Sequence, residues 1–436
     1  MTHRLRCMAC GAEYPAGEVR YECDRVMGEP PERCGGLLDV QHDLASLRGR
    51  ISSRLFDERL GAWRGLDASG VWRYRELILP LNAEDVVSRP EGNTPLYRDR
   101  RLAEWVGVED LEIKHEGENP TGSFKDRGMT VGISQARRLG AAAVACASTG
   151  NTSASLAAYG ALAGMRVWVF VPEGKVALGK LAQAVAYGAR TLQVRGDFDV
   201  TMEVVRQACD RCDIYLLNSV NPFRVEGQKS IIFEMLQQRD WQVPDWIVLP
   251  AGNLGNASAF GKALMELKEI GLIERIPRLA CIQAEGANPF FLSYRDGFQK
   301  RHRVVAQTVA TAIRIGNPVS YDRAVRALQW TQGVVAQVSD RDIMQAKAEV
   351  DSVGIGCEPA SASSIAGIRF LAGAGVIGRD DTVVALLTGH LLKDPETTLS
   401  YYLGQLNGVA PGRPARPVVV DPDIDSITRV LEGASP

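Results

Sequence analysis

The sequence predicts an α/β protein with two doubly wound domains of parallel sheet and a small Cys-rich module in front of them. From about residue 130 onward, short apolar runs alternate with helical stretches in two successive series. Alternation of this kind is typical of parallel sheets that helices cover on both faces. The N-terminal residues are rich in Cys and Gly and lack periodic apolar positions. A chain of 436 residues has room for all three parts.

The N-terminal module, residues 1–45, has cysteines spaced like those of a zinc ribbon. Cys7 and Cys10 form a C-x-x-C pair, which is typical of structural zinc sites. The second pair, Cys23 and Cys34, has ten intervening residues instead of two. We expect these four thiols to bind a structural Zn²⁺, with a metal-free ribbon as the alternative.

The rest of the chain divides into two domains and a tail. Residues 46–130 and 240–410 are expected to form the larger domain, with polar helical stretches before residue 110. Residues 131–239 are expected to form a smaller α/β domain. Residues 411–436 read as a Pro-rich linker and a terminal helix. A cleft between two such domains is a favoured place for a ligand.

The elements of each series follow from its apolar runs. The first series predicts strands at 142–147, 166–171, 191–194 and 214–217. Its helices are expected at 151–164, at 177–188 and from Phe198. The second series predicts strands at 246–250, 279–283 and 382–387, with helices at 257–270 and near 340–353 and 360–371.

Lys125 follows a tight Pro/Gly turn and falls in the first turn of a predicted helix. The partial positive charge of a helix N-terminus disfavours an ammonium group there. A neutral amine is the form that makes a Schiff base with a carbonyl compound. The alternative is a solvated lysine at a helix start.

A phosphate cradle is predicted between strand 246–250 and the following helix. Its residues are Gly252, Asn253, Leu254, Gly255 and Asn256. Glycines let the backbone approach an anion, and the N–H groups of a helix start point at it. A plain turn is the alternative. A literal G-x-G-x-x-G at residues 373–378 precedes a strand, which is the reverse of a dinucleotide site, and the sequence has no P-loop.

Polar residues also follow three other predicted strands. Asn151 and Thr152 can bind a carboxylate or a ring oxygen, or cap the helix that starts there. Arg224, which follows Asn218 and Ser219, can clamp a phosphate or pair with Glu226. Thr388 can bond a ring nitrogen of a cofactor or satisfy backbone groups. We expect His390 to have a structural role. We expect the C-x-x-C spacing of Cys209 and Cys212 to be a chance occurrence.

Composition excludes several classes of function. Lys and Arg number 50 against 52 Asp and Glu, so the net charge of −2 creates no field for nucleic acid or anionic lipid. No apolar run reaches the length of a membrane span, and the N-terminus has no signal core, so we expect a cytoplasmic protein. Nine cysteines, an odd number, indicate reduced thiols.

Together these motifs resemble those of threonine synthases, a family of fold-type II enzymes that use pyridoxal 5′-phosphate (PLP). The resemblance covers roughly residues 85–400 in the family's order, through the segments NPTGSFKDRGMT, ACASTGNTSAS, ALGKLAQ, NSVNPFRVEGQKS, PAGNLGN, ATAIRIGNP and LTGHLLKDP. NSVNPFRVEGQKS and ATAIRIGNP resemble threonine synthases in particular. The Cys-bearing segment resembles the ribbon that precedes some members.

The resemblance implies roles for the candidate residues. Lys125 is expected to be the Schiff-base lysine and general acid/base. Asn151 is expected to contact the PLP ring hydroxyl, the cradle its phosphate, and Thr388 its pyridine nitrogen. The substrate's phosphate and carboxylate are expected to contact Thr152, Asn218, Ser219, Arg224 and Asn253.

The implied activity is that of a carbon–oxygen lyase in threonine biosynthesis. It converts O-phospho-L-homoserine and water into L-threonine and phosphate by γ-elimination and β-addition. A homodimer is also implied. Three alternatives remain: a β-replacing synthase such as one that makes cysteate from phosphoserine, a threonine or serine ammonia-lyase, and a catalytically dead zinc-binding relative.

Overall fold

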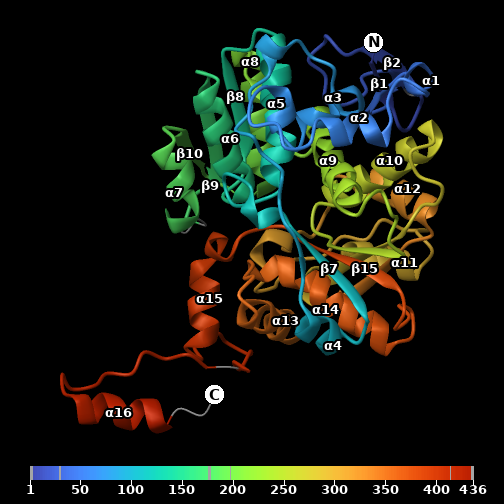
Figure 1. Ribbon diagram of the computed structural model, residues 1–436. Coiled ribbons are helices and arrows are strands. Elements are labelled where there is room, and N and C mark those ends of the chain that lie inside the picture. The colour runs from blue at the N-terminus through green and yellow to red at the C-terminus, as the bar shows by residue number, and fades with distance from the viewer. Residues whose placement is uncertain (1–2, 29–30, 175–177, 197, 413, 434–436) are drawn as a thin grey trace.

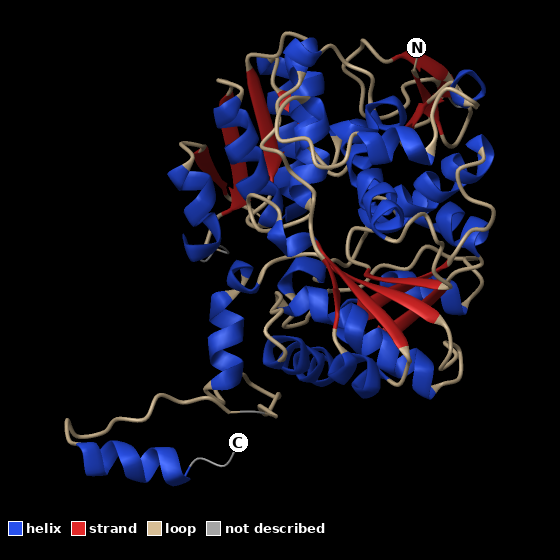
Figure 2. Cartoon of the chain, in the orientation of Figure 1, coloured by secondary structure: helices blue, strands red, loops and turns tan. Residues whose placement is uncertain are grey.

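Two parallel sheets organise the chain in the computed structural model, which describes residues 3–28, 31–174, 178–196, 198–412 and 414–433 (Figures 1 and 2). The smaller sheet has the strand order β10 (Arg190–Val194), β9 (Arg166–Pro172), β8 (Ala143–Ala147) and β11 (Tyr215–Leu216). All of its pairings are parallel. The larger sheet has the order β14 (Val334–Val338), β13 (Arg278–Ala284), β12 (Trp246–Pro250), β15 (Thr382–Leu387), β7 (Asp110–His115) and β6 (Leu96–Arg98).

The predicted α/β class with two parallel sheets is confirmed. In the larger sheet β6 alone runs antiparallel to its described neighbour. Helices cover both faces because the strands alternate their apolar side chains between two cores. One face packs against α4 (Arg100–Val106), α13 (Asp340–Ser352) and α14 (Pro359–Gly373), and the other against α9 (Pro222–Gln238), α10 (Gly255–Ile270) and α12 (Tyr321–Thr331).

The smaller sheet is covered in the same way. Its one face packs against α5 (Lys125–Arg138), α6 (Asn151–Leu162) and α7 (Leu178–Ala186), and its other face against α8 (Phe198–Cys212). Every strand and helix predicted for the first series lies within a few residues of its expected place. Strand β8 is a continuous apolar run, whereas β10 also contains Arg190 and Gln193.

The expectation of helical structure before residue 110 is incomplete, because β6 lies within that stretch and β7 begins at its end. Strand β7 reads Asp-Leu-Glu-Ile-Lys-His, yet its Glu112 and Lys114 are as buried as its apolar residues. Ion pairs compensate this burial: Lys114 Nζ lies 2.7 Å from Glu234 Oε1. Strand β14 and helices α9 and α12 were also absent from the predicted elements.

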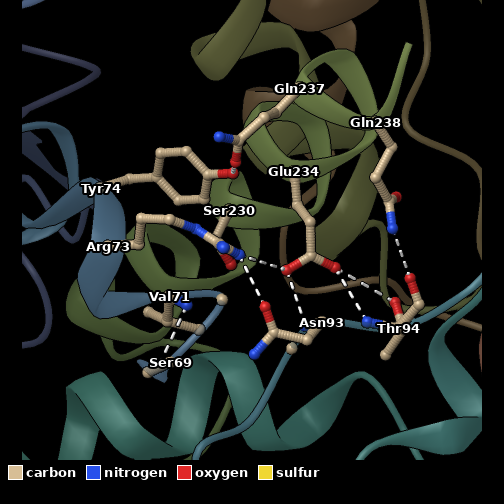
Figure 3. Close-up of polar contacts among 12 residues, drawn as sticks. Ser69, Val71, Arg73, Tyr74, Asn93, Thr94, Ser230, Glu234, Gln237 and Gln238 are labelled. Carbon is tan, nitrogen blue, oxygen red and sulfur yellow. Dashed lines mark hydrogen bonds and ion pairs between the residues drawn. The ribbon is translucent and has the colours of Figure 1, made fainter. Parts of the chain in front are cut away.

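Helix α9 carries the centre of a buried polar network (Figure 3). The carboxylate of Glu234 accepts bonds from the backbone N–H groups of Asn93, at 2.7 Å, and Thr94, at 3.0 Å. Arg127 of α5 donates to it at 2.7 Å. Figure 3 shows Arg73 and Asn93 on one side of this carboxylate and Thr94 on the other. The network therefore joins α5, α9, β7 and the 91–94 loop.

The N-terminal module is a three-stranded antiparallel sheet with a separate hairpin. Its sheet has the order β2 (Glu13–Pro15), β1 (Arg4–Cys7) and β5 (Leu38–Gln41). The hairpin pairs β3 (Val26–Met27) with β4 (Glu32–Arg33). Short helices α1 (Leu44–Leu47), α2 (Ser53–Glu58) and α3 (Arg75–Ile78) lead into the body.

The end of the chain extends away from the body (Figure 1). Helix α15 (Pro395–Tyr402) follows the last strand, β15, and is itself followed by an extended segment and by α16 (Ile424–Gly433). Helix α11 (Pro289–Arg295) lies earlier, between β13 and α12. Val419 and Leu431 in this tail are 96% and 70% exposed. Among the described residues, no helix is both long and apolar enough to span a bilayer. The division of the chain into the four predicted segments stays a prediction.

Candidate active site

A cavity of about 960 Å³ lies where the carboxyl ends of strands from the two sheets meet. Its wall includes the ends of β8 and β11 from the smaller sheet and of β12 and β15 from the larger one. The predicted cofactor- and substrate-binding residues all lie in this wall: Lys125, Asn151, Thr152, Asn218, Ser219, Arg224, Gly252, Asn253, Leu254, Gly255, Asn256 and Thr388. Residues more than 260 positions apart in the sequence thus form one site.

Lys125 is the first residue of α5, as predicted. The preceding loop is held against the turn after β15, since the Phe124 N–H donates to the Thr388 carbonyl at 3.1 Å. Phe124 at the N-cap position of α5 makes no side-chain capping bond, and the Lys125 N–H donates to the Ser123 hydroxyl at 3.4 Å. Burial, together with the nearby charge of Arg224, lowers the pKa of Lys125 to about 7. The amine is therefore available in its neutral form near neutral pH.

The cradle has the geometry of an anion site. Helix α10 begins at Gly255 without a side-chain cap, and Leu254 before it has a φ of 63°. A Cβ at Gly255 would lie 3.2 Å from Gln228 Oε1, and one at Gly252 would lie 3.0 Å from Ile313 Cα. Asn256 Oδ1 is buried and finds no hydrogen-bond partner among the described residues. These features fit a phosphate group held by backbone N–H groups.

Asn151 and Thr388 both contact the carboxylate of Glu358 in the cavity wall. The Asn151 amide donates to Glu358 Oε2 at 3.1 Å, and the Thr388 hydroxyl lies 3.5 Å from Glu358 Oε1. Burial raises the pKa of this glutamate. Gly150, without a side chain, occupies the cap position of α6, so capping by Ser, Thr or Asn does not occur there. Glu358, which was not predicted from the sequence, thus bridges the two residues expected to contact the PLP ring.

Arg224 is buried beside the cavity without a carboxylate partner among the described residues. Its Nη1 donates to the Leu217 carbonyl at 3.1 Å, while its Nε has no partner in the described part of the chain. The alternative pairing with Glu226 is wrong, since Glu226 instead lies 2.6 Å from Lys229 Nζ. Burial lowers the pKa of Arg224 to about 10. A buried, uncompensated guanidinium of this kind fits an anionic ligand.

Two asparagines connect the parts of the site. Asn218 bonds both the N–H and the carbonyl of Ala147, at 2.9 and 3.1 Å, and so ties the ends of β11 and β8 together. Asn253 of the cradle donates to the Ser219 hydroxyl at 3.1 Å. The cradle and the loop after β11 are therefore held at a fixed separation.

The comparisons with known proteins agree with this arrangement. A family model described as pyridoxal-phosphate dependent enzyme matches residues 87–389. A threonine synthase of Methanosarcina acetivorans is 47% identical over 433 residues, which cover 99% of each chain. A threonine synthase of Methanocaldococcus jannaschii is 43% identical over 98% of this chain and 99% of its own. The chain belongs to the threonine synthase family.

Solved structures show the same fold. The threonine synthase of Escherichia coli superposes with a TM-score of 0.66 at 20% identity, covering 90% of each chain. A threonine deaminase from Solanum lycopersicum superposes with a TM-score of 0.60 at 21% identity, over 70% of this chain and 80% of its own. At such identities the likeness concerns the fold alone. The assignment to the threonine synthase family therefore rests on the relatives that are 43–47% identical and on the match to the model of pyridoxal-phosphate dependent enzymes.

Two further residues of the cavity wall, Glu358 and Gln228, were not predicted from the sequence. Glu358 precedes Pro359 at the start of α14, and an acidic residue before a proline is a helix-start signal that could have located it. Gln228 lies on α9, a helix buried on nearly all sides that no apolar periodicity reveals. Both positions became visible only when the elements were assembled.

Proposed function

We propose that the protein is a threonine synthase that converts O-phospho-L-homoserine and water into L-threonine and phosphate with bound PLP. One observation supports this above the others: the wall of one cavity contains Lys125 together with two candidate anion sites. The uncapped cradle fits one phosphate and the unpaired Arg224 fits another. A PLP enzyme acting on an unphosphorylated amino acid needs the first alone.

The chain's residues fit PLP at the positions that the family resemblance implies. We infer that Lys125 holds the aldehyde carbon, that Asn151 donates to the ring hydroxyl and that the Thr388 hydroxyl meets the ring nitrogen. The cradle, Gly252 to Asn256, holds the phosphate. Bound PLP supplies an electron sink for negative charge that develops on the substrate's carbon atoms.

The remaining residues are inferred to bind the substrate and to move protons. Arg224 takes the γ-phosphate with its planar fork, and the loop of Ser219 and the start of α6 at Thr152 receive the substrate's other oxygens. Asn218 and Asn253 hold these parts in place. The balance is one water in and one phosphate out. The Cβ–H and Cγ–O bonds break, a proton is delivered to Cγ, the hydroxide of water adds at Cβ, and the remaining proton of that water ends on the phosphate.

Lys125 is the group inferred to move these protons. Because its pKa lies at about 7, the amine can accept a proton from Cα and return one without a large driving force. It lies at the start of α5, in the wall of the cavity that also contains the cradle and Arg224. Substitution of Lys125 by Ala should abolish the visible absorbance of bound PLP, and turnover by the variant would contradict this role.

A direct assay separates this function from its rivals. The purified protein with PLP should release inorganic phosphate from O-phospho-L-homoserine much faster than from O-phospho-L-serine. The reverse preference would support a β-replacing synthase. Release of ammonia from threonine or serine without phosphate chemistry would support an ammonia-lyase, and a colourless protein that takes up no PLP would support a catalytically dead relative.

The assembly and the location of the protein belong to the same proposal. We infer a homodimer from the family resemblance, and a mass in solution of twice the 47.4 kDa chain would support it. A mass of one chain at micromolar concentration would contradict it. We infer a cytoplasmic location from the family resemblance, and fractionation of cells that express the full chain would check it.

A further inference from the structure

The four cysteines of the N-terminal module form a cluster that the active site does not use. Cys7 Sγ lies 3.7 Å from Cys34 Sγ, and Cys10 Sγ lies 3.6 Å from Cys23 Sγ. All four sulfur atoms lie within 4.8 Å of one another. Disulfide bonds require about 2.05 Å, so these are four free thiols held together. A tetrahedron of thiolates around Zn²⁺, with Zn–S bonds of about 2.3 Å, has edges of about 3.8 Å.

The local fold explains how a stretched second pair still closes the cluster. The residues between Cys23 and Cys34 include the β3–β4 hairpin, which folds out and returns the chain to its starting point. The Cys34 N–H donates to the Arg25 carbonyl at 2.8 Å, and the Cys23 N–H donates to the Gly36 carbonyl at 2.9 Å. A Cβ at Gly36 would lie 2.7 Å from Cys7 Sγ, so glycine leaves room for the sulfur atoms.

The segment just before Cys23 contacts strand β11 and the cavity wall. Tyr21, two residues before Cys23, accepts the Leu216 N–H of β11 at 2.7 Å through its hydroxyl. Its ring centroid lies 5.9 Å from that of Tyr215. Glu22 accepts a bond at 3.0 Å from Arg206, which lines the cavity. Strand β11 ends two residues before Asn218.

The other side of the module is fixed to the larger sheet's helices. Asp39 of β5 accepts bonds from Lys262 at 2.9 Å and from Arg326 at 2.6 Å, and His42 lies 2.6 Å from Glu226. A second group of potential ligands is formed by His42, Glu226 and Glu266. The ammonium group of Lys229 lies among them and offsets the negative charge of the two carboxylates. That group anchors the module and is not a metal site.

We propose that Cys7, Cys10, Cys23 and Cys34 bind one Zn²⁺ as thiolates and that this metal holds Tyr21 and Glu22 against the strand that carries the substrate loop. Zinc binding releases the thiol protons and closes the loops between the ligands. Without the metal, the segments that carry the four cysteines lose their shared ligand, and we expect the Leu216 N–H to lose its acceptor. The consequence for substrate binding rests on the proposed function, whereas the metal site does not.

Measurement of the metal content tests the proposed zinc site. The purified full chain should contain one zinc atom per chain by mass spectrometry, and Co²⁺ exchange should give the intense near-ultraviolet and visible bands of a tetrahedral thiolate site. Cys10→Ser and Cys34→Ser should reduce the zinc content at least tenfold. Cys212→Ser, an exposed cysteine of the other C-x-x-C, should leave it unchanged. A zinc-free protein after growth with added Zn²⁺, iron in place of zinc, or equal loss in Cys212→Ser would overturn the assignment.

Hydrogen–deuterium exchange tests the proposed coupling between the metal site and strand β11 without relying on enzyme activity. Peptides that cover residues 214–221 should exchange faster in zinc-depleted protein and in Tyr21→Phe, which retains its zinc. Tyr294→Phe on α11 is the matched control and should change neither. In phosphate-release assays Tyr21→Phe should raise KM for phosphohomoserine about fivefold while bound PLP stays constant. Unchanged exchange in both forms would overturn the coupling, and a chain inactive on phosphohomoserine but with the exchange effect would contradict the proposed function instead.

Discussion

Lys125 illustrates how one side chain acquires its chemistry from its surroundings. The sequence predicted its place at the start of a helix, and the structure adds burial and the charge of Arg224 as the main causes of its lowered pKa. Glu358 acts in the opposite direction, since its carboxylate favours the protonated amine. The pKa of about 7 is the balance of these effects.

This balance predicts the pH dependence of PLP uptake by the PLP-free protein. The neutral amine attacks the aldehyde, and its fraction rises with pH through the pKa of Lys125. The uptake rate should therefore rise with a midpoint near pH 7, as followed by visible absorbance. In Glu358→Gln the midpoint should move to lower pH. A midpoint near the ordinary lysine value, above pH 9.5 or so, would contradict the account.

Arg224 should separate the two phosphates. Arg224→Gln removes the buried charge inferred to hold the substrate, so KM for phosphohomoserine should rise about 100-fold while PLP affinity changes less than about threefold. Arg314→Gln, at an exposed position of the cavity wall, is the matched control and should change both only slightly. Comparable losses for PLP and substrate in Arg224→Gln would mean that the two phosphate sites have been interchanged.

At the scale of elements, the sequence predicts strands well where burial is purely apolar and poorly where it is ionic. Strand β8 is a continuous apolar run and was placed within one residue. Strand β7 contains Glu112 and Lys114, and their burial depends on partners from β6 and α9. Arg98 lies 14 residues from Glu112, but Glu234 lies 120 residues from Lys114, and no local pattern reveals a partner at that distance.

The turn after β15 depends on a single serine of α14. The Ser361 hydroxyl accepts the N–H groups of Thr388 and Gly389, each at 2.9 Å. Ser361→Ala leaves both buried donors without this acceptor, so stability should fall by about 2 kcal/mol and PLP should bind more weakly. Ser363→Ala removes a hydroxyl that bonds within its own helix and is the control. Equal melting temperatures and PLP affinities for the two variants would contradict this role.

At the scale of the whole molecule, the network around Glu234 joins the elements that carry Lys125 and Arg224. The positive charges of Arg127 and Lys114 hold the pKa of Glu234 well below its usual range, against the effect of burial. A carboxyl with a depressed pKa stabilises the folded state above its unfolded pKa of about 4.3, and this contribution is lost as pH falls further. The helices that carry Lys125 and Arg224, α5 and α9, are therefore also the helices that this network joins to β7.

Glu234→Gln should consequently lower the melting temperature by several degrees at pH 7, through about 3 kcal/mol of lost compensation for the buried cations. The difference from the natural protein should narrow below about pH 4, where the carboxylate begins to lose its advantage. Calorimetry across this range measures it. A constant difference at all pH values would indicate a packing effect and not the loss of charge.

The tail is the part of the molecule least connected to the site. The last residue of the cavity wall along the described chain is Glu396, and residues 418–432 are largely exposed. Deletion of residues 418–436 should leave PLP content and phosphate release within twofold of the full chain. The sequence predicted a linker and a helix here, and nothing in its pattern or in the described contacts assigns them to the chemistry.

Isotope labelling tests the central claim, that water adds to carbon after phosphate leaves. The reaction of O-phospho-L-homoserine in H₂¹⁸O should give L-threonine with one ¹⁸O at its hydroxyl and phosphate with none, as mass spectrometry of both products would show. The label distinguishes cleavage of the Cγ–O bond from hydrolysis at phosphorus. Labelled phosphate together with homoserine would contradict the account.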